Sequence, residues 1–233
     1  AVFRPSGGIW YVNRSTAGFT AFGWGMSSDR LTPADFDGDD KTDYAVWRED
    51  LPEKAAFYIF QSSSNTFRVA LFGQNGDDPR LVGDWDGDGK ADPAVFRNSA
   101  IGGQSYFFYL GSANNPAGTI TYIPFGMTGD RGLRGDYDGD GKMDACVYRA
   151  SDQGWYIRLS GGPSVVFERW GLPSDRFVPT DYDGDGKTDL VSSDYNANAL
   201  SVLLNNGDGT FALPYSVVTG SGPLQARCLY SAS

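Results

Sequence analysis

The chain has 233 residues, a formal net charge of −10 at pH 7 and no histidine. This length suffices for one large all-β domain or two small ones. The lack of histidine excludes Ser-His-Asp and Cys-His catalytic sites. The sequence contains no apolar run long enough to predict a membrane span. It also contains no basic patch that would favour nucleic acid as a partner.

The N-terminal residues 1–26 predict three short β-strands. The first is Ala1-Val2-Phe3-Arg4, the second contains Trp10-Tyr11-Val12, and the third ends at Trp24-Gly25. These segments are rich in β-branched and aromatic residues and are separated by Gly, Asn and Ser, a composition typical of strands and turns. The same order of segments returns in four later units, at residues 27–75, 76–126, 127–171 and 172–216.

Three strand motifs recur along these units. The first motif is repeated at residues 45–48, 94–97, 146–149 and, in degenerate form, 190–193. The second is repeated at residues 57–59, 106–108, 155–157 and 201–203. The third ends in an aromatic-Gly pair, followed by an Asp and then an Arg, at Asp29-Arg30, Asp78-Pro79-Arg80, Asp130-Arg131 and Asp175-Arg176. We expect these Asp and Arg residues to fix turns or to brace neighbouring units.

An acidic nonapeptide precedes the first strand motif of the later units. The string Asp-x-Asp-Gly-Asp-x-Lys-x-Asp occurs at residues 35–43, 84–92, 136–144 and 181–189, with Asp40 in the first copy where the others have Gly. Alternate carboxylates on a tightly curled loop point towards a common centre, which is how calcium is bound by several oxygen ligands. The sequence therefore predicts four structural calcium sites in an internally repeated protein.

The predicted ligands are the four aspartates of each loop and the main-chain carbonyl of its lysine, whose ammonium should face solvent. They are Asp35, Asp37, Asp39, Lys41, Asp43, Asp84, Asp86, Asp88, Lys90, Asp92, Asp136, Asp138, Asp140, Lys142, Asp144, Asp181, Asp183, Asp185, Lys187 and Asp189. An EF-hand would need Glu at position 12 and flanking helices, and zinc would favour Cys or His. Neither pattern is present.

Four strands per repeated unit predict a β-propeller. Residues 222–231 resemble a first strand without its acidic loop, so pairing of this tail with residues 1–4 would close a ring of five blades. The alternative is a slice of a longer array. The sequence leaves open whether Cys146 and Cys228 form a disulfide.

The acidic loops, the aromatic-Gly pairs and Asn205-Asn206-Gly207-Asp208-Gly209-Thr210-Phe211 together resemble the FG-GAP / VCBS repeat family. The calcium loops of this family also occur in the propellers of integrin α-subunits. The resemblance covers nearly the whole chain and implies a calcium-binding propeller with an extracellular role in recognition or adhesion. It does not specify a ligand.

We expect a secreted, non-catalytic recognition module that binds carbohydrate. Aromatic rings can pack against the C–H faces of sugars, and the candidate rings recur at related positions: Trp10, Trp24, Trp47, Trp155 and Trp170. The alternatives are a protein-binding adhesion or scaffold module of a surface protein and, less favoured, a glycan-degrading enzyme with two free carboxylates in a cleft.

Overall fold

The structure is a computed structural model that describes residues 1–51, 54–98, 103–162, 164–194 and 198–218. Apart from one 3-10 turn at Pro5–Gly7, the regular elements of this part are β-strands. None of the described elements is a helix of the length and apolarity that crossing a membrane requires.

The strands form five antiparallel sheets in chain order. The first sheet contains β1 (Val2–Arg4), β2 (Ile9–Arg14) and β3 (Gly18–Gly23). The second contains β4 (Arg30–Leu31), β5 (Tyr44–Leu51), β6 (Lys54–Phe60) and β7 (Phe67–Leu71). The third contains β8 (Ala94–Arg97), β9 (Gln104–Tyr109) and β10 (Thr121–Met127). The fourth contains β11 (Arg131–Gly135), β12 (Asp144–Arg149), β13 (Gly154–Arg158) and β14 (Val165–Arg169). The fifth contains β15 (Arg176–Phe177), β16 (Leu190–Asp194), β17 (Ala199–Leu203) and β18 (Tyr215–Val218).

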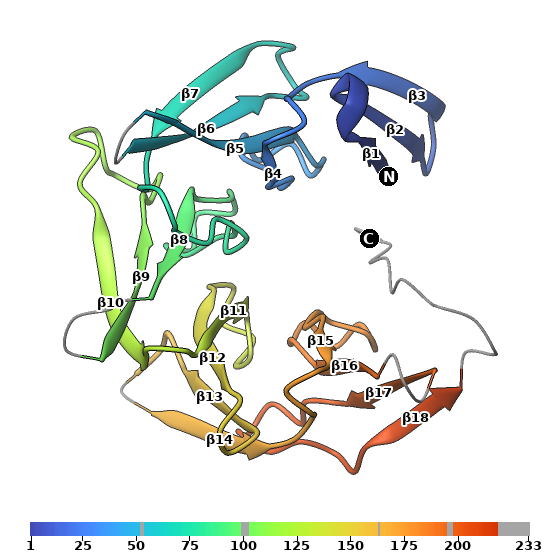
Figure 1. Cartoon of the computed structure of the whole chain (residues 1–233), viewed down its shortest axis with the longest axis vertical. Coiled ribbons are helices and arrows are strands. Elements are labelled where there is room, and N and C mark those ends of the chain that lie inside the picture. Colours follow the sequence, from blue (N-terminus) through green and yellow to red (C-terminus); the bar gives the residue numbers. More distant parts are fainter. Residues whose placement is uncertain (52–53, 99–102, 163, 195–197, 219–233) are drawn as a thin grey trace.

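The five sheets are arranged around a ring, with the first strand of each sheet nearest the centre (Figure 1). This confirms the predicted five-bladed β-propeller. In the third blade, the place of an innermost strand is taken by two isolated bridges, between Asp78 and Phe96 and between Gly83 and Asp92. Strands β10 and β18 end at Met127 and Val218, just beyond the expected unit ends at 126 and 216. The expected pairing of residues 222–231 with residues 1–4 lies outside the described residues, as does Cys228.

The hydrophobic core lies between neighbouring blades. One buried cluster joins Phe36 and Trp47 of the second blade to Val82 and Val95 of the third. Equivalent clusters join the third blade to the fourth and the fourth to the fifth. Each blade therefore needs its neighbour to bury its apolar faces, which is the reason a propeller is built by repetition.

The Asp and Arg residues that follow the aromatic-Gly pairs brace the fold as expected. The buried aspartates bind a more distant arginine, however, rather than the one next to them in the sequence. Buried aspartates at the start of the second, third and fourth blades bind the arginine that ends the first strand motif: Asp29 with Arg48, Asp77 with Arg97 and Asp130 with Arg149. The adjacent arginines reach the next blade instead. Arg30 donates to the carbonyl of Asp77, and Arg131 donates to the carbonyl of Asp175.

The fifth blade departs from this pattern. In the fourth blade the first strand residue Arg131 pairs with Tyr148, and in the fifth blade the equivalent Arg176 pairs with Ser193. Ser193 is therefore the counterpart of Tyr148. The degenerate motif runs over residues 191–194, one residue later than the sequence alignment suggested. Asp194 therefore occupies the register position of Arg149. Asp175, the fifth blade's buried aspartate, accepts a hydrogen bond from Ser192, and its Oδ1 atom has no hydrogen-bond partner.

Candidate metal sites and the surrounding loops

Each aspartate loop joins the innermost part of a blade to the next strand. The residue before position 1 of the loop pairs with position 9, so the loop is closed at its base. These pairs are Ala34–Asp43, Gly83–Asp92, Gly135–Asp144 and Thr180–Asp189. The closure forces the intervening residues to curl over a short distance.

The position 1 carboxylate organises the curl. In the third loop, Asp136 Oδ1 accepts the N–H of Gly139 at 2.7 Å, and Asp136 Oδ2 accepts the N–H of Gly141 at 2.8 Å. Both glycines have positive φ, 75° and 86°, a conformation that most side chains disfavour. Asp40 adopts φ 61° at the equivalent of Gly141, as expected for a residue that tolerates this region.

Three carboxylates converge in each loop. In three loops they come from positions 1, 3 and 9, and in the first loop from positions 1, 3 and 5, with the candidate ligand atoms of each group within 4.8 Å of one another. The clusters are Asp35, Asp37 and Asp39; Asp84, Asp86 and Asp92; Asp136, Asp138 and Asp144; and Asp181, Asp183 and Asp189. The other predicted acids, Asp43, Asp88, Asp140 and Asp185, lie in the same loops but outside these groups.

The position 9 aspartate ties the loop to a neighbouring hairpin of the same blade. Asp92 Oδ2 accepts the N–H of Trp85 at 3.0 Å, and Asp92 Oδ1 accepts the N–H of Ser112 at 2.9 Å. The hairpin residues in this role are Ser62, Ser112, Ser160 and Asn205. Sequence reasoning missed them, although a serine after the second strand motif of three units was the available signal.

Burial and crowding of the carboxylates make the clusters electrostatically unfavourable without a cation. Burial, followed by the charges of Asp86 and Asp84, raises the pKa of Asp92 to about 7. The same causes, with Asp138 and Asp136 as the charged neighbours, raise the pKa of Asp144 to about 7. A bound divalent cation would relieve both effects.

The donor set fits a hard cation. At position 3, the buried Oδ1 atoms of Asp37 and Asp86 have no hydrogen-bond partner. A buried carboxylate oxygen without a donor is costly, and coordination to a cation would satisfy it. The clusters offer only carboxylate oxygens, which suit calcium or magnesium rather than zinc.

Two of the loop lysines pair with an acid of their own loop, Lys41 with its side chain 71% exposed and Lys187 with its side chain 24% exposed. Lys41 Nζ lies 2.9 Å from Asp39, and Lys187 Nζ lies 2.9 Å from Asp185. The lysine stems also cross to the preceding loop. A Cβ atom added to Gly87 would lie 2.6 Å from Lys142 Cε, at the end of a flexible side chain, and the φ of 83° at this position favours glycine.

Main-chain hydrogen bonds connect successive loops. The N–H at position 8 of one loop donates to the carbonyl at position 1 of the loop before it. The three contacts are Ala91 to Asp35 at 2.6 Å, Met143 to Asp84 at 2.7 Å, and Thr188 to Asp136 at 2.6 Å. The aspartate loops are therefore part of the seam between blades as well as candidate metal sites.

The five tryptophans proposed as ligand contacts occupy two environments. Trp10, Trp47 and Trp155 are 4%, 1% and 0% exposed, and their indole N–H groups donate to main-chain carbonyls. These three rings belong to the core and present no face to a ligand in this conformation. Trp24 and Trp170 are partly exposed and remain candidates.

Residues 181–230, which begin at the fourth aspartate loop, match the family model of the FG-GAP-like repeat. This segment of the propeller therefore resembles an FG-GAP-like repeat. The motif that opens the matched segment recurs in the other three aspartate loops. No curated protein sequence matches the chain.

The solved structures that resemble this propeller include two from different organisms. One is an Agrocybe aegerita lectin, described as recognising non-reducing terminal N-acetylglucosamine, with a TM-score of 0.56 and 18% identity. The alignment covers 90% of this chain and 60% of the lectin chain, so the likeness shows a shared fold over part of the lectin. The other is the Tc holotoxin pore of Photorhabdus luminescens, with a TM-score of 0.42, 17% identity, and coverage of 75% of this chain and 10% of that chain.

Proposed function

We propose that this chain is a calcium-stabilised, extracellular recognition module that binds carbohydrate without catalysing a reaction. The observation that carries the calcium assignment is the convergence of three carboxylates in each of four loops, with orphaned buried oxygens at position 3 of two loops. The aspartates also carry hydrogen bonds that shape the loops and attach them to hairpins. A cation held there would stabilise the ring.

Support for carbohydrate as the ligand comes from the fold shared with the Agrocybe aegerita lectin. The boundary between the fourth and fifth blades also holds a cavity where apolar and polar side chains meet, and such places favour small-molecule binding. We assign the module to the extracellular space because calcium sites of this kind often need the millimolar calcium found there.

A non-catalytic role is favoured by the state of the carboxylates near the fourth and fifth blades. Hydrogen bonds from the Thr210 side chain and main chain lower the pKa of Asp208, which keeps this carboxylate ionised. Glycoside hydrolysis needs one carboxyl group with a raised pKa as the acid and a second free carboxylate. Asp138, the other acid at this boundary, belongs to the third aspartate cluster.

A second candidate function is protein binding. The outermost strands carry large exposed apolar side chains, among them Phe67 at 65%, Leu71 at 78% and Tyr122 at 62% exposure. Exposed apolar groups of this size are compatible with a protein partner around the rim.

The deciding experiment is a glycan-array screen of the purified chain in millimolar calcium, with circular dichroism to establish that the sample is folded. Calcium-dependent binding to a coherent set of glycans, including terminal N-acetylglucosamine, is the expected result. No binding by a folded, calcium-loaded sample would move the assignment to the protein-binding module.

A further inference from the structure

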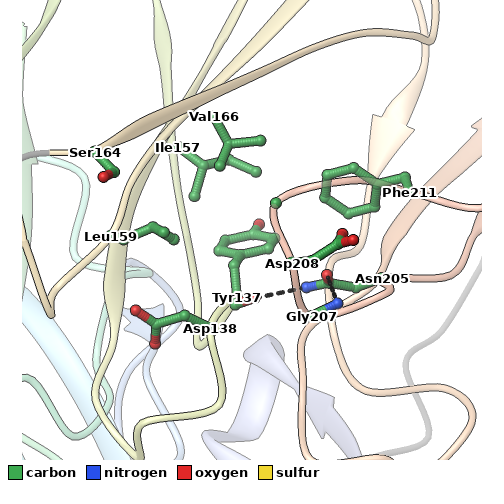
Figure 2. A pocket seen from close by; sticks show the side chains of 11 residues that line it. Tyr137, Asp138, Ile157, Leu159, Ser164, Val166, Asn205, Gly207, Asp208 and Phe211 are labelled. Carbon is green, nitrogen blue, oxygen red and sulfur yellow. Dashed lines mark hydrogen bonds between the residues drawn. The ribbon is translucent and has the colours of Figure 1, made fainter.

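A cavity of about 320 Å³ lies at the boundary between the fourth and fifth blades. Its wall combines Tyr137 and Asp138 of the third aspartate loop with Ile157 and Val166 of β13 and β14. The hairpin between β17 and β18 contributes Asp208 and Phe211 from the opposite side (Figure 2).

The buried hydroxyl of Tyr137 is the unusual feature of this cavity. Tyr137 is 3% exposed, and its Oη atom has no nitrogen or oxygen hydrogen-bond partner. Figure 2 shows the ring in the middle of the lining side chains, with the hydroxyl directed among them. The Cys146 thiol is the neighbour that interacts with the hydroxyl by a side-chain hydrogen bond, and sulfur is only a weak acceptor. A ligand that accepts a hydrogen bond would satisfy the hydroxyl.

At the second–third and third–fourth boundaries, one of the two equivalent positions carries a larger side chain. The pair Ile157 and Val166 corresponds in register to Ile59 and Arg68 in the second blade and to Tyr109 and Thr121 in the third. Arg68 lies over the ring of Phe36, with its Cζ atom 5.9 Å from the ring centroid. Tyr109 stacks on Trp85, with ring centroids 5.6 Å apart. The cavity is open because the fourth blade has small aliphatic side chains at both positions.

The lining defines the chemical class of the ligand. Aliphatic side chains and the ring of Phe211 offer an apolar surface, while Asp138 and Asp208 offer carboxylate oxygens that accept from hydroxyl groups. No described lining residue is basic, which disfavours an anionic ligand. The volume is at the small end of ligand pockets, so it suits one ring rather than a chain of rings.

We propose that this cavity binds a single pyranose unit, with the Tyr137 hydroxyl as a buried donor and the Asp138 and Asp208 carboxylates as acceptors for the sugar hydroxyls. The proposal rests on the carbohydrate-binding function above and gives it a location. Because Asp138 also belongs to the third aspartate cluster, the wall of this site depends on the state of that loop.

The test uses variants that copy other blades of the same chain. V166R introduces the side chain found at Arg68, and I157Y introduces the one found at Tyr109, so both fill the cavity with groups that this fold already accommodates. Y137F removes only the hydroxyl, and Phe36 is already present at that position of the first loop. The control is R68V, which changes the same register position at a different boundary.

Binding is measured with the calcium-loaded full chain by calorimetry and saturation-transfer NMR against methyl glycosides of hexoses and N-acetylhexosamines. We expect V166R and I157Y to abolish binding and Y137F to weaken it about tenfold, whereas R68V binds as the unmodified chain does. Melting curves identify any variant that fails to fold. Because V166R and I157Y fill the same cavity, either one alone suffices for the test if the other does not fold.

The outcomes separate the site from the function. If the unmodified chain binds a glycoside and the folded V166R, I157Y and Y137F variants bind it equally well, the cavity assignment is overturned and the carbohydrate-binding function stands. If the folded unmodified chain binds none of the glycosides, both are overturned.

Discussion

Arg97 holds Asp77 through two hydrogen bonds of 2.7 Å, from Nε to Oδ1 and from Nη2 to Oδ2. The Asp77 side chain is 1% exposed, and the guanidinium also lies 4.6 Å from the ring centroid of Phe108. This arrangement joins the turn that begins the third blade to the strand β8. The same arrangement recurs at Asp29 with Arg48 and at Asp130 with Arg149.

Arg97→Ala should therefore destabilise the protein by about 3 kcal/mol, because it leaves the buried Asp77 carboxylate without its cation. Urea unfolding in calcium measures the loss. Arg80→Ala is the matched control, since Arg80 binds Asp78 at 2.6 Å but is 74% exposed, and exposed pairs contribute about 0–1 kcal/mol. Equal losses in the two variants would contradict the structural role of the buried pair.

Asp194→Arg should stabilise the fifth blade. It places an arginine at the register position of Arg149, two residues after Ser192 on β16, whose hydroxyl contacts Asp175, and offers a partner to the orphaned Asp175 Oδ1. We expect a gain of about 1 kcal/mol, seen as a melting temperature a few degrees higher. Asp194→Ala separates the removal of a negative charge from the new ion pair. A melting temperature no higher than that of Asp194→Ala would count against the pairing.

Calcium should raise the melting temperature of the chelator-treated protein by more than 10 °C, because each occupied site contributes about 2.7 kcal/mol at a hundredfold excess over its dissociation constant. Differential scanning calorimetry measures the shift, and isothermal titration measures the number of ions. Asp86→Asn should lower the ion count by one site. Asp40→Gly is the control that should keep all four sites, since the other loops have glycine there. An unchanged melt on chelation would exclude a structural role for calcium.

The metal-free protein should lose stability as the pH rises from about 4 to 7. The pKa values of Asp92 and Asp144 are about 7 in the folded state, above the ordinary value of 3.8. In this range the folded state therefore holds protons that the unfolded state has already released, and each group lowers stability by up to about 1.4 kcal/mol per pH unit between the two pKa values. The stabilising effect of these protons is complete below the unfolded pKa and is lost as the pH passes 7.

Urea unfolding in chelator at pH 5, 6, 7 and 8 measures this dependence. Asp92→Asn and Asp144→Asn should each remove part of the slope, and saturating calcium should flatten the profile because coordination requires the ionised carboxylate. A metal-free profile that rises with pH would show that these carboxylates are not the groups that titrate.

Much of this architecture follows from local sequence. The aspartate nonapeptide and the alternation of strand and turn residues specify short-range structure, and their repetition specifies the ring. The partner of Asp77 was not predictable in the same way, because Arg97 lies 20 residues away and reaches it only after the blade has folded. The adjacent Arg80 offered a nearer partner, and it binds Asp78 instead.

The placement of the tryptophans follows the repeat. Trp10 and Trp155 share the second strand motif and are both buried, whereas Trp24 and Trp170 share the aromatic-Gly pair and are both partly exposed. The cavity beside Tyr137, by contrast, was invisible in the sequence, since it results from the sizes of Ile157 and Val166 relative to their counterparts in other blades.

The main-chain bonds between successive loops affect how this repeat can diverge. Position 8 is Ala91, Met143 and Thr188 in the three contacts, residues of different size and polarity, because the bond common to all three is made by the amide group. At Thr188 the side-chain hydroxyl also accepts the N–H of Asp136 at 3.0 Å. The main-chain bond itself survives a change of side chain, whereas proline, which lacks the N–H, would remove it. Neighbouring blades can thus change their surface side chains independently while the main-chain hydrogen bond between their loops is kept.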